Sequence, residues 1–232
     1  MEAEYPDLHP FYKSVFNDTV KDELIAGELA FVRCFFEEWA GNFLHPLGND
    51  LGGRRGKLNS ILYSYMASQS HTFDWLSHTL MFGHYDTVFR ELRTILENLF
   101  YMYSLDISFQ TKTVGEKFQK LAQLEAIGKE PHGKVVFETS GYIHWQPSYN
   151  LYKQLSRYIH IHTNVSAKHA LQIAEQGFPE ILDIKYSRQS FTQCSSAWRE
   201  IAKSALHLAL YLCQKLNVEI SELCPDHLEQ VW

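Results

Sequence analysis

The chain has 232 residues, and its hydrophobic content of 45% and charged content of 21% are ordinary for a soluble globular protein with a core of its own. The formal net charge of -6 excludes wholesale wrapping of DNA, because that needs an excess of phosphate-neutralising cations, although a small basic site fits this charge. The N-terminal residues resemble no signal peptide, and no apolar run is long enough to span a membrane. We therefore expect a cytoplasmic protein with no membrane partner.

Cysteine and aromatic residues give two further expectations. The four cysteines form no Cys-x-x-Cys pair, which predicts free thiols rather than a zinc site or a disulfide framework. Aromatic residues make up 14% of the chain. Because each aromatic side chain buries a large area, we expect an aromatic-rich core or subunit interface.

Apolar residues recur at helical spacing along most of the chain, and strand patterns are scarce. Thr113 and Glu116 add a capping-box signature at the start of one expected helix. The ranges expected to be helical are about 17–40, 58–82, 87–105, 113–128, 149–163, 164–177 and 187–216.

These ranges predict an all-α fold, an up-and-down bundle of five to six main helices in a single domain over residues 1–232. An irregular lead is expected over 1–16, the bundle over 17–217, and a tail over 218–232 that ends in a dangling Trp232. An irregular insert is expected before the fourth or fifth helix.

This insert covers Lys129–Pro147, where prolines and glycines interrupt any helical period. Within it, Val135–Thr139 reads as a short strand or an extended loop. Ser148 is then expected to cap the following helix.

Residues 41–57 form a glycine-rich stretch that ends in Arg54, Arg55 and Lys57. It is expected to be irregular, and it is either a solvated connector or an anion-binding loop built from backbone N–H groups and these cations. Its spacing approaches that of a phosphate-binding P-loop, but Leu58 stands where the magnesium-binding hydroxyl belongs. A nucleoside triphosphatase is therefore rejected.

One expected helix carries Arg90, Arg93 and Glu97 on a single stripe. Arg93 and Glu97 are an i,i+4 pair, and Arg90 lies within about 20° of Glu97 around the helix. The stripe is either a surface ion pair of small energetic effect or a charge set between helices that orients another group.

In the stretch Tyr149–Thr163, Arg157 is followed closely by His160 and His162, and no other part of the sequence brings a fixed cation so close to two groups that titrate near neutral pH. On a continuous helix Lys153, Arg157 and His160 share one face. His162 can converge with Arg157 only if the helix ends around His160 to Thr163. The two alternative pairs are therefore Arg157 with His160 and Arg157 with His162.

Such a pair has a chemical use as well as a structural one. A histidine can exchange a proton with a ribose hydroxyl or a leaving oxygen, and an arginine can hold a phosphate with two parallel hydrogen bonds. Together these groups suffice for RNA cleavage without a metal ion. The structural alternative is that they solvate the C-terminus of a helix, where cations are favourable.

A metal site is not expected. His144, His160, His162 and His169 could supply imidazoles, but no His-x-x-x-His pair with a nearby acidic ligand occurs among them. No cofactor is expected either.

The segment Arg157-Tyr-Ile-His-Ile-His162 resembles the Arg-x4–6-His motif of the HEPN superfamily, whose members are all-helical and include many toxin and antiviral ribonucleases. Gly83–Glu97 together with Tyr152–His160 also resembles a group of uncharacterised helical proteins linked to abortive infection. That group shares an Arg-x-x-x-Glu helix and a later Leu-Ser-x-Tyr-Val-His segment.

The resemblance implies a function and a set of site residues. Arg157 would bind the scissile phosphate and His162 would act as acid or base, while His160 matches the second group. The remaining substrate-binding candidates are Lys153, Arg90, Arg93 and Glu97. The resemblance also implies RNA as a partner and a homodimer with facing motifs. Tyr158 departs from the small polar residue that usually follows the arginine, which leaves a non-catalytic interaction or regulatory module as the alternative.

Overall fold

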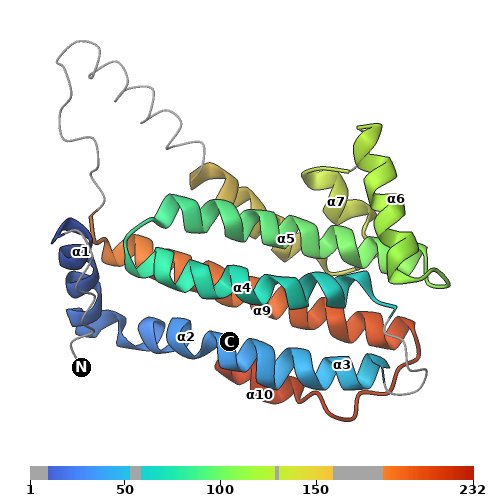
Figure 1. Ribbon diagram of the computed structural model, residues 1–232, viewed down its shortest axis with the longest axis horizontal. Helices are drawn as coiled ribbons and strands as arrows, with labels where there is room; N and C mark the ends of the chain where they lie inside the picture. The colour runs from blue at the N-terminus through green and yellow to red at the C-terminus, as the bar shows by residue number, and fades with distance from the viewer. Residues whose placement is uncertain (1–9, 53–58, 129–130, 159–184) are drawn as a thin grey trace.

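The computed structural model describes residues 10–52, 59–128, 131–158 and 185–232. Every regular element in these ranges is helical (Figure 1), so the expected all-α fold is confirmed for them. Residues 145–158 are helical. The other elements are α1 (Pro10–Lys21), the 3-10 turn η1 (Glu23–Ile25), α2 (Ala26–Glu37), the π-helical η2 (Glu38–Leu44), α3 (His45–Gly52), α4 (Ile61–Met81), α5 (Tyr85–Ser108), α6 (Val114–Ala126), α7 (Lys134–Thr139), α9 (Arg188–Lys215) and α10 (Pro225–Val231).

The long helices lie side by side in a bundle. α5 packs most extensively against α9 and α4, and α2 with η2 and α3 forms a bent rod along one side of α4 (Figure 1). The helix of residues 145–158 lies beside α5 on the opposite side, and α6 and α7 stand next to the C-terminal end of α5 (Figure 1). Within the described ranges, no helix is both long and apolar enough to cross a membrane.

Four of the expected helices occur nearly as predicted. α4, α5, α6 and α9 match the ranges read from the periodicity, and the capping box of Thr113 and Glu116 is formed at the start of α6. Gly83 follows α4 with a φ of 79°, a left-handed conformation that suits glycine and ends the helix there.

The single helix expected over residues 17–40 is wrong, and so is the irregular lead over the described residues 10–16. The chain is helical from Pro10 and breaks between α1 and α2, where the Asp22 carboxylate accepts a hydrogen bond from the Leu24 N–H at 3.0 Å. The same carboxylate accepts from Arg188 Nε at 2.6 Å. This ion pair ties the break to the start of α9, and it is a long-range contact that periodicity does not contain.

The glycine-rich stretch is helical as far as the structure describes it, through Gly52, so its expected irregularity is wrong up to that residue. Phe43, Leu44 and Leu47 are buried here, and their packing outweighs the low helix propensity of glycine. A side chain at Gly48 would meet the Tyr63 hydroxyl at 2.5 Å, so glycine allows α3 to approach α4 closely. Arg54, Arg55 and Lys57 lie outside the described residues.

The core is rich in aromatic rings, as the composition predicts. Phe35 and Trp39 each lie 4.9 Å from Phe73, and Phe73 stacks on Trp198 at 5.3 Å. Trp232 is 3% exposed and packs on Phe35 and Trp39, at 5.9 Å from each ring. The expectation of a dangling Trp232 is therefore wrong, because the tail closes over the core.

A buried carboxylate holds the segment that leads into α10. Asp50 accepts hydrogen bonds from the backbone N–H groups of Ser221, Glu222 and Leu223 and from the Ser221 hydroxyl. Burial alone would raise the pKa of the Asp50 carboxyl, but these hydrogen bonds outweigh it and hold the pKa below its usual value. The tail is thus fixed by polar contacts at Asp50 and by apolar packing at Trp232.

The insert before the next helix is more regular than expected. Residues 134–139 form α7, so the reading of Val135–Thr139 as a strand or extended loop is wrong. Val136 and Phe137 are buried, and Phe137 lies 4.7 Å from Phe100 on α5. The next helix already includes residue 145, so Ser148 lies inside it and does not cap it.

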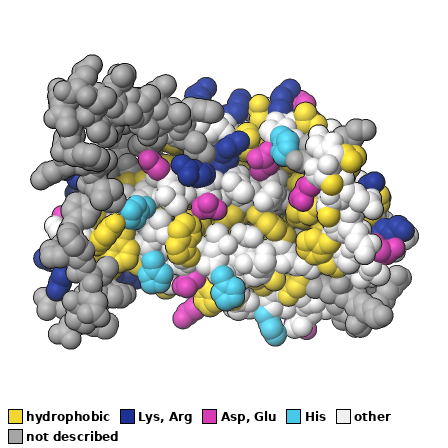
Figure 2. Space-filling model, turned by 45° about the horizontal axis from the view of Figure 1, so that its top comes forward, with side chains coloured by type: hydrophobic (Ala, Val, Ile, Leu, Met, Phe, Trp, Pro, Cys, Tyr) yellow, Lys and Arg dark blue, Asp and Glu magenta, His cyan; other side chains and the backbone are white. Residues whose placement is uncertain are grey.

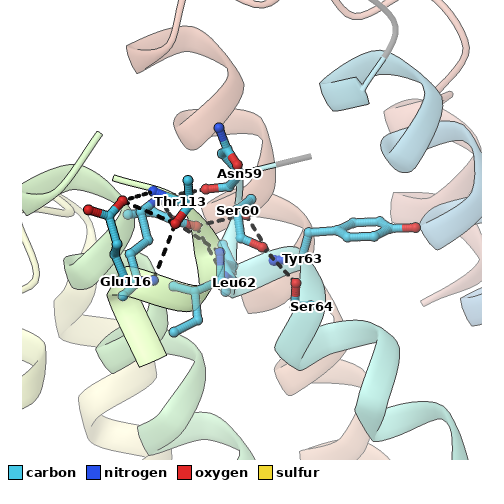
Figure 3. Close-up of polar contacts among 10 residues, drawn as sticks. Asn59, Ser60, Leu62, Tyr63, Ser64, Thr113 and Glu116 are labelled. Carbon is cyan, nitrogen blue, oxygen red and sulfur yellow. Dashed lines mark hydrogen bonds and ion pairs between the residues drawn. The ribbon is translucent and has the colours of Figure 1, made fainter. Parts of the chain in front are cut away.

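The second half of the bundle is joined by a buried ion pair between α5 and α6. Asp106 and Lys117 have side chains that are 1% and 2% exposed, and Lys117 Nζ lies 2.7 Å from Asp106 Oδ1. Asp106 also accepts from the Ser60 hydroxyl and from the first two N–H groups of α4. One carboxylate therefore closes the N-terminus of α4 and receives the lysine of α6. Figure 3 shows the polar contacts around it, with Ser60 bonded to Tyr63 and Ser64 at the start of α4 and Thr113 bonded to Glu116 at the start of α6.

Candidate functional site

The residues singled out from the sequence come from α5 and the helix of residues 145–158. Along α5, Phe89 contacts Tyr158 and Arg93 contacts Tyr152. From the first contact to the second, the residue number rises on α5 and falls on the other helix, so the two helices pack antiparallel. This arrangement brings the two sequence motifs together, although Arg93 and Tyr152 are 59 residues apart in the chain.

Arg93 is bound by the neighbouring helix. Its Nη2 donates to the Tyr152 hydroxyl at 2.6 Å, and its guanidinium carbon lies 4.8 Å from the centre of the Tyr152 ring. The Arg93 Nε is buried and has no hydrogen-bond partner among the described residues. The sequence left two interpretations of this stripe. Arg93 fits a charge that orients another group better than it fits a surface ion pair.

Glu97 has a partner of its own. It accepts a hydrogen bond from the Gly133 N–H at 2.6 Å, just before α7. Gly133 has a φ of 58°, a conformation that favours glycine and turns the chain into α7. Arg93 and Glu97 therefore each hold a different segment against α5, and their assignment to substrate binding stays a prediction.

Tyr158 fixes the end of the described part of its helix. Its ring stacks on Phe89 with centroids 4.3 Å apart and an interplanar angle of 8°. Tyr158 is the residue that departs from the HEPN pattern, and its bulk is used for packing on α5. A small polar side chain at this position would lose that contact.

Three of the predicted basic residues, on α5 and the helix of residues 145–158, are exposed. Arg157 precedes Tyr158, Arg90 follows Phe89, and Lys153 lies one turn before Arg157. Lys153 Nζ also lies 5.0 Å from the centre of the Tyr149 ring. Figure 2 shows several Lys and Arg side chains on the face that carries these helices, with acidic side chains among them. This face can offer cations to an anion in solution.

His160 and His162 lie outside the described residues, so the choice between the two histidine pairings stays open. Within the described ranges, no group of three or more His, Cys, Asp or Glu side chains is placed to hold a metal ion. The four cysteines, Cys34, Cys194, Cys213 and Cys224, are free thiols, as the sequence predicts.

Several features of this part of the molecule depend on contacts that are distant in sequence. The sequence does not predict the partners of Arg93 and Tyr158, because each partner lies on a helix far away in the chain. A pocket beside the start of the helix of residues 145–158, lined in part by Tyr142, Lys203 and Tyr211, was also missed. Its residues are spread over about seventy positions and form no spacing motif.

Comparison of the chain with protein-family models, curated proteins and solved structures finds no match in any of the three.

Proposed function

We propose that the protein is a HEPN-like RNA-binding protein that cleaves RNA without a metal ion. Arg157 holds a backbone phosphate, and His160 or His162 exchanges protons with the reacting oxygens. Arg90 and Lys153 add positive charge beside it.

The observation that supports the proposal is the contrast between Arg157 and its neighbour. Arg157 is exposed, while Tyr158 is stacked on Phe89 and fixes the backbone beside it. A positioned backbone lowers the entropy lost when the guanidinium binds a phosphate. Arg90 is also exposed and directly follows Phe89, so each ring of this stack has an exposed arginine next to it in the sequence.

Binding is tested by measuring the affinity of the purified protein for a single-stranded RNA at several salt concentrations. Arg157→Ala is expected to weaken binding about tenfold. It should also reduce the magnitude of the slope of log affinity against log salt concentration by the amount due to one phosphate contact, about one. Arg33→Ala is the matched control, because Arg33 is also an exposed arginine but lies on α2. Equal affinities for wild type and Arg157→Ala would refute Arg157 as the phosphate ligand.

Cleavage is tested separately with mixed RNA in the presence of EDTA. The wild type is expected to cleave, and Arg157→Ala is expected not to. Of His160→Ala and His162→Ala, the variant that loses cleavage while still binding RNA identifies the acid–base residue. RNA that stays intact with the wild type, or cleavage that needs a divalent metal, would rule out the proposed reaction.

A second candidate, a non-catalytic homodimer, is favoured by a different observation. Four large apolar side chains are exposed in and around α6 and α7, namely Phe118, Ile127, Val135 and Ile143, at 45–67%. Large exposed apolar patches mark protein interfaces, and we infer that these side chains contribute to one. Sedimentation of the wild type and of Phe118→Ser distinguishes this candidate, since a dimer formed through this surface would dissociate in the variant.

A further inference from the structure

A pocket of about 740 Å³ lies between α9 and the turn that leads into the helix of residues 145–158. Its volume falls within the range of small-molecule binding sites, roughly 300–1,000 Å³. The α9 side chains in its wall recur every three or four residues, so one face of this helix forms one wall. The lining residues are Tyr142, His144, Pro147, Ser148, Glu200, Lys203, Ser204, His207, Leu210, Tyr211 and Gln214.

One part of the wall is aromatic. The Tyr142 ring lies 5.4 Å from the Tyr211 ring at an angle of 80° and 5.8 Å from the His144 ring at an angle of 77°. Each neighbour therefore meets Tyr142 edge to face, which holds the rings in fixed directions. Such a wall suits the flat face or the edge of a planar ring.

The same aromatic wall has a polar atom behind it. The Tyr103 ring lies 6.2 Å from Tyr142 and 6.4 Å from Tyr211. The Tyr103 hydroxyl is buried and has no hydrogen-bond partner among the described residues. Tyr103 does not line the pocket, so it supports the wall from behind through its ring contacts with Tyr142 and Tyr211.

The cation of the lining is Lys203. Its Nζ lies 3.6 Å from Glu200, and the two side chains are 34% and 57% exposed. An ion pair of this exposure contributes little to stability. The Lys203 ammonium, the less exposed of the two groups, can therefore leave Glu200 and bind a ligand anion at small cost in free energy. The described lining contains one lysine and no arginine, and Glu200 stands nearby, a combination that suits a single negative charge better than a phosphate dianion.

We propose that this pocket binds a small planar aromatic ligand that carries one carboxylate. The carboxylate lies on Lys203, and the ring lies against Tyr142 and Tyr211. Ser148 and Ser204 already bond to each other at 3.0 Å, which stabilises the pocket where α9 meets the helix of residues 145–158.

The proposal is independent of RNA binding. The pocket lies beside the first residues of its helix, whereas Arg157 lies near the last described residue of that helix. Arg157→Ala is therefore expected to leave ligand binding unchanged, and failure of one proposal does not entail failure of the other.

The test is calorimetric titration of the full chain with 2-naphthoate and with 4-hydroxybenzoate, each compared with its neutral primary amide. The wild type is expected to bind at least one carboxylate about tenfold more tightly than its amide. Lys203→Met keeps the apolar stem and is expected to remove this difference, leaving acid and amide with similar affinities. Tyr211→Leu is expected to weaken both members of the pair.

Lys134→Met is the matched control. Lys134 also pairs with a glutamate one turn away, Glu138, but it lies on α7 outside the pocket. Thermal unfolding of each variant verifies that it is folded. The proposal is overturned if the wild type binds neither carboxylate at about 1 mM, or if Lys203→Met keeps the preference for the carboxylate.

Discussion

Two cations of this protein, Lys117 and Arg157, are in opposite situations. Lys117 is 2% exposed and meets Asp106 at 2.7 Å, beside further donors that satisfy the same carboxylate. Arg157 is exposed, on a helix whose neighbouring tyrosine is stacked on α5. Both residues lie beside long helices of the same bundle, and only one of them is enclosed by it.

Lys117 and Arg157 show how burial decides whether a charge serves stability or remains available for binding. A charge that is buried must be fully paired, because the loss of water around it is compensated only by good contacts. A charge left in water contributes little to folding and keeps its capacity to bind an anion. Lys117 therefore belongs to the scaffold, Arg157 is a candidate for function, and Arg93 lies between the two.

The largest effect is expected at the buried pair. Asp106→Ala leaves Lys117 buried without its carboxylate and also removes the acceptor at the N-terminus of α4. The free energy of unfolding should fall by about 3–5 kcal/mol, measured by urea denaturation. Glu138→Ala, which breaks the exposed pair with Lys134, should change it by less than about 1 kcal/mol. A small loss in Asp106→Ala would mean that the pair is not part of the scaffold.

The contact between Arg93 and Tyr152 should have an intermediate effect. Tyr152→Phe removes the hydroxyl that accepts from the guanidinium but keeps the ring. Hydrogen bonds to charged groups contribute about 1.5–3 kcal/mol, and we expect a loss of that order in the free energy of unfolding. Tyr149→Phe, on the same helix, is the control and should cost less. Equal losses in the two variants would argue against a specific role for the Arg93 contact.

A third test uses pH. Because the pKa of Asp50 is lowered in the folded state, its contribution to stability is present above the pKa of the unfolded chain and is lost as pH falls through the lower folded value. Asp50→Asn should therefore be less stable than wild type at pH 7, and the difference should shrink below about pH 4. Denaturation at several pH values measures it, with the exposed Asp18→Asn as control. A difference that stays constant with pH would contradict the assignment.

The smallest effect on stability is expected at Arg157. Arg157→Ala should change the free energy of unfolding by no more than about 0.5 kcal/mol, as for other exposed positions. The same variant should lose RNA affinity. Asp106→Ala is therefore expected to lower mainly the stability, and Arg157→Ala mainly the affinity for RNA. A loss of more than about 1 kcal/mol would place Arg157 in the scaffold instead.

Local sequence determined much of the bundle. Val88, Leu92 and Leu99 recur at helical spacing and are buried along α5, and Thr113 with Glu116 marks the start of α6. These features depend on residues within a few positions of one another, so they can be read without the fold. The candidate motifs around Arg93 and Arg157 are likewise local in sequence, but only the structure shows that their helices pack together.

Only the tertiary structure decided which charges and rings find partners. Lys117 meets Asp106, Trp232 meets Trp39, and Asp50 meets the backbone near Ser221, and each pairing depends on how the helices are packed. The glycine-rich α3 and the β-branched α7 are helical because buried side chains on them outweigh local propensity. Periodicity therefore identified α4, α5, α6 and α9, whereas burial, which depends on the whole chain, determined the remaining helices and the partners of the charged side chains.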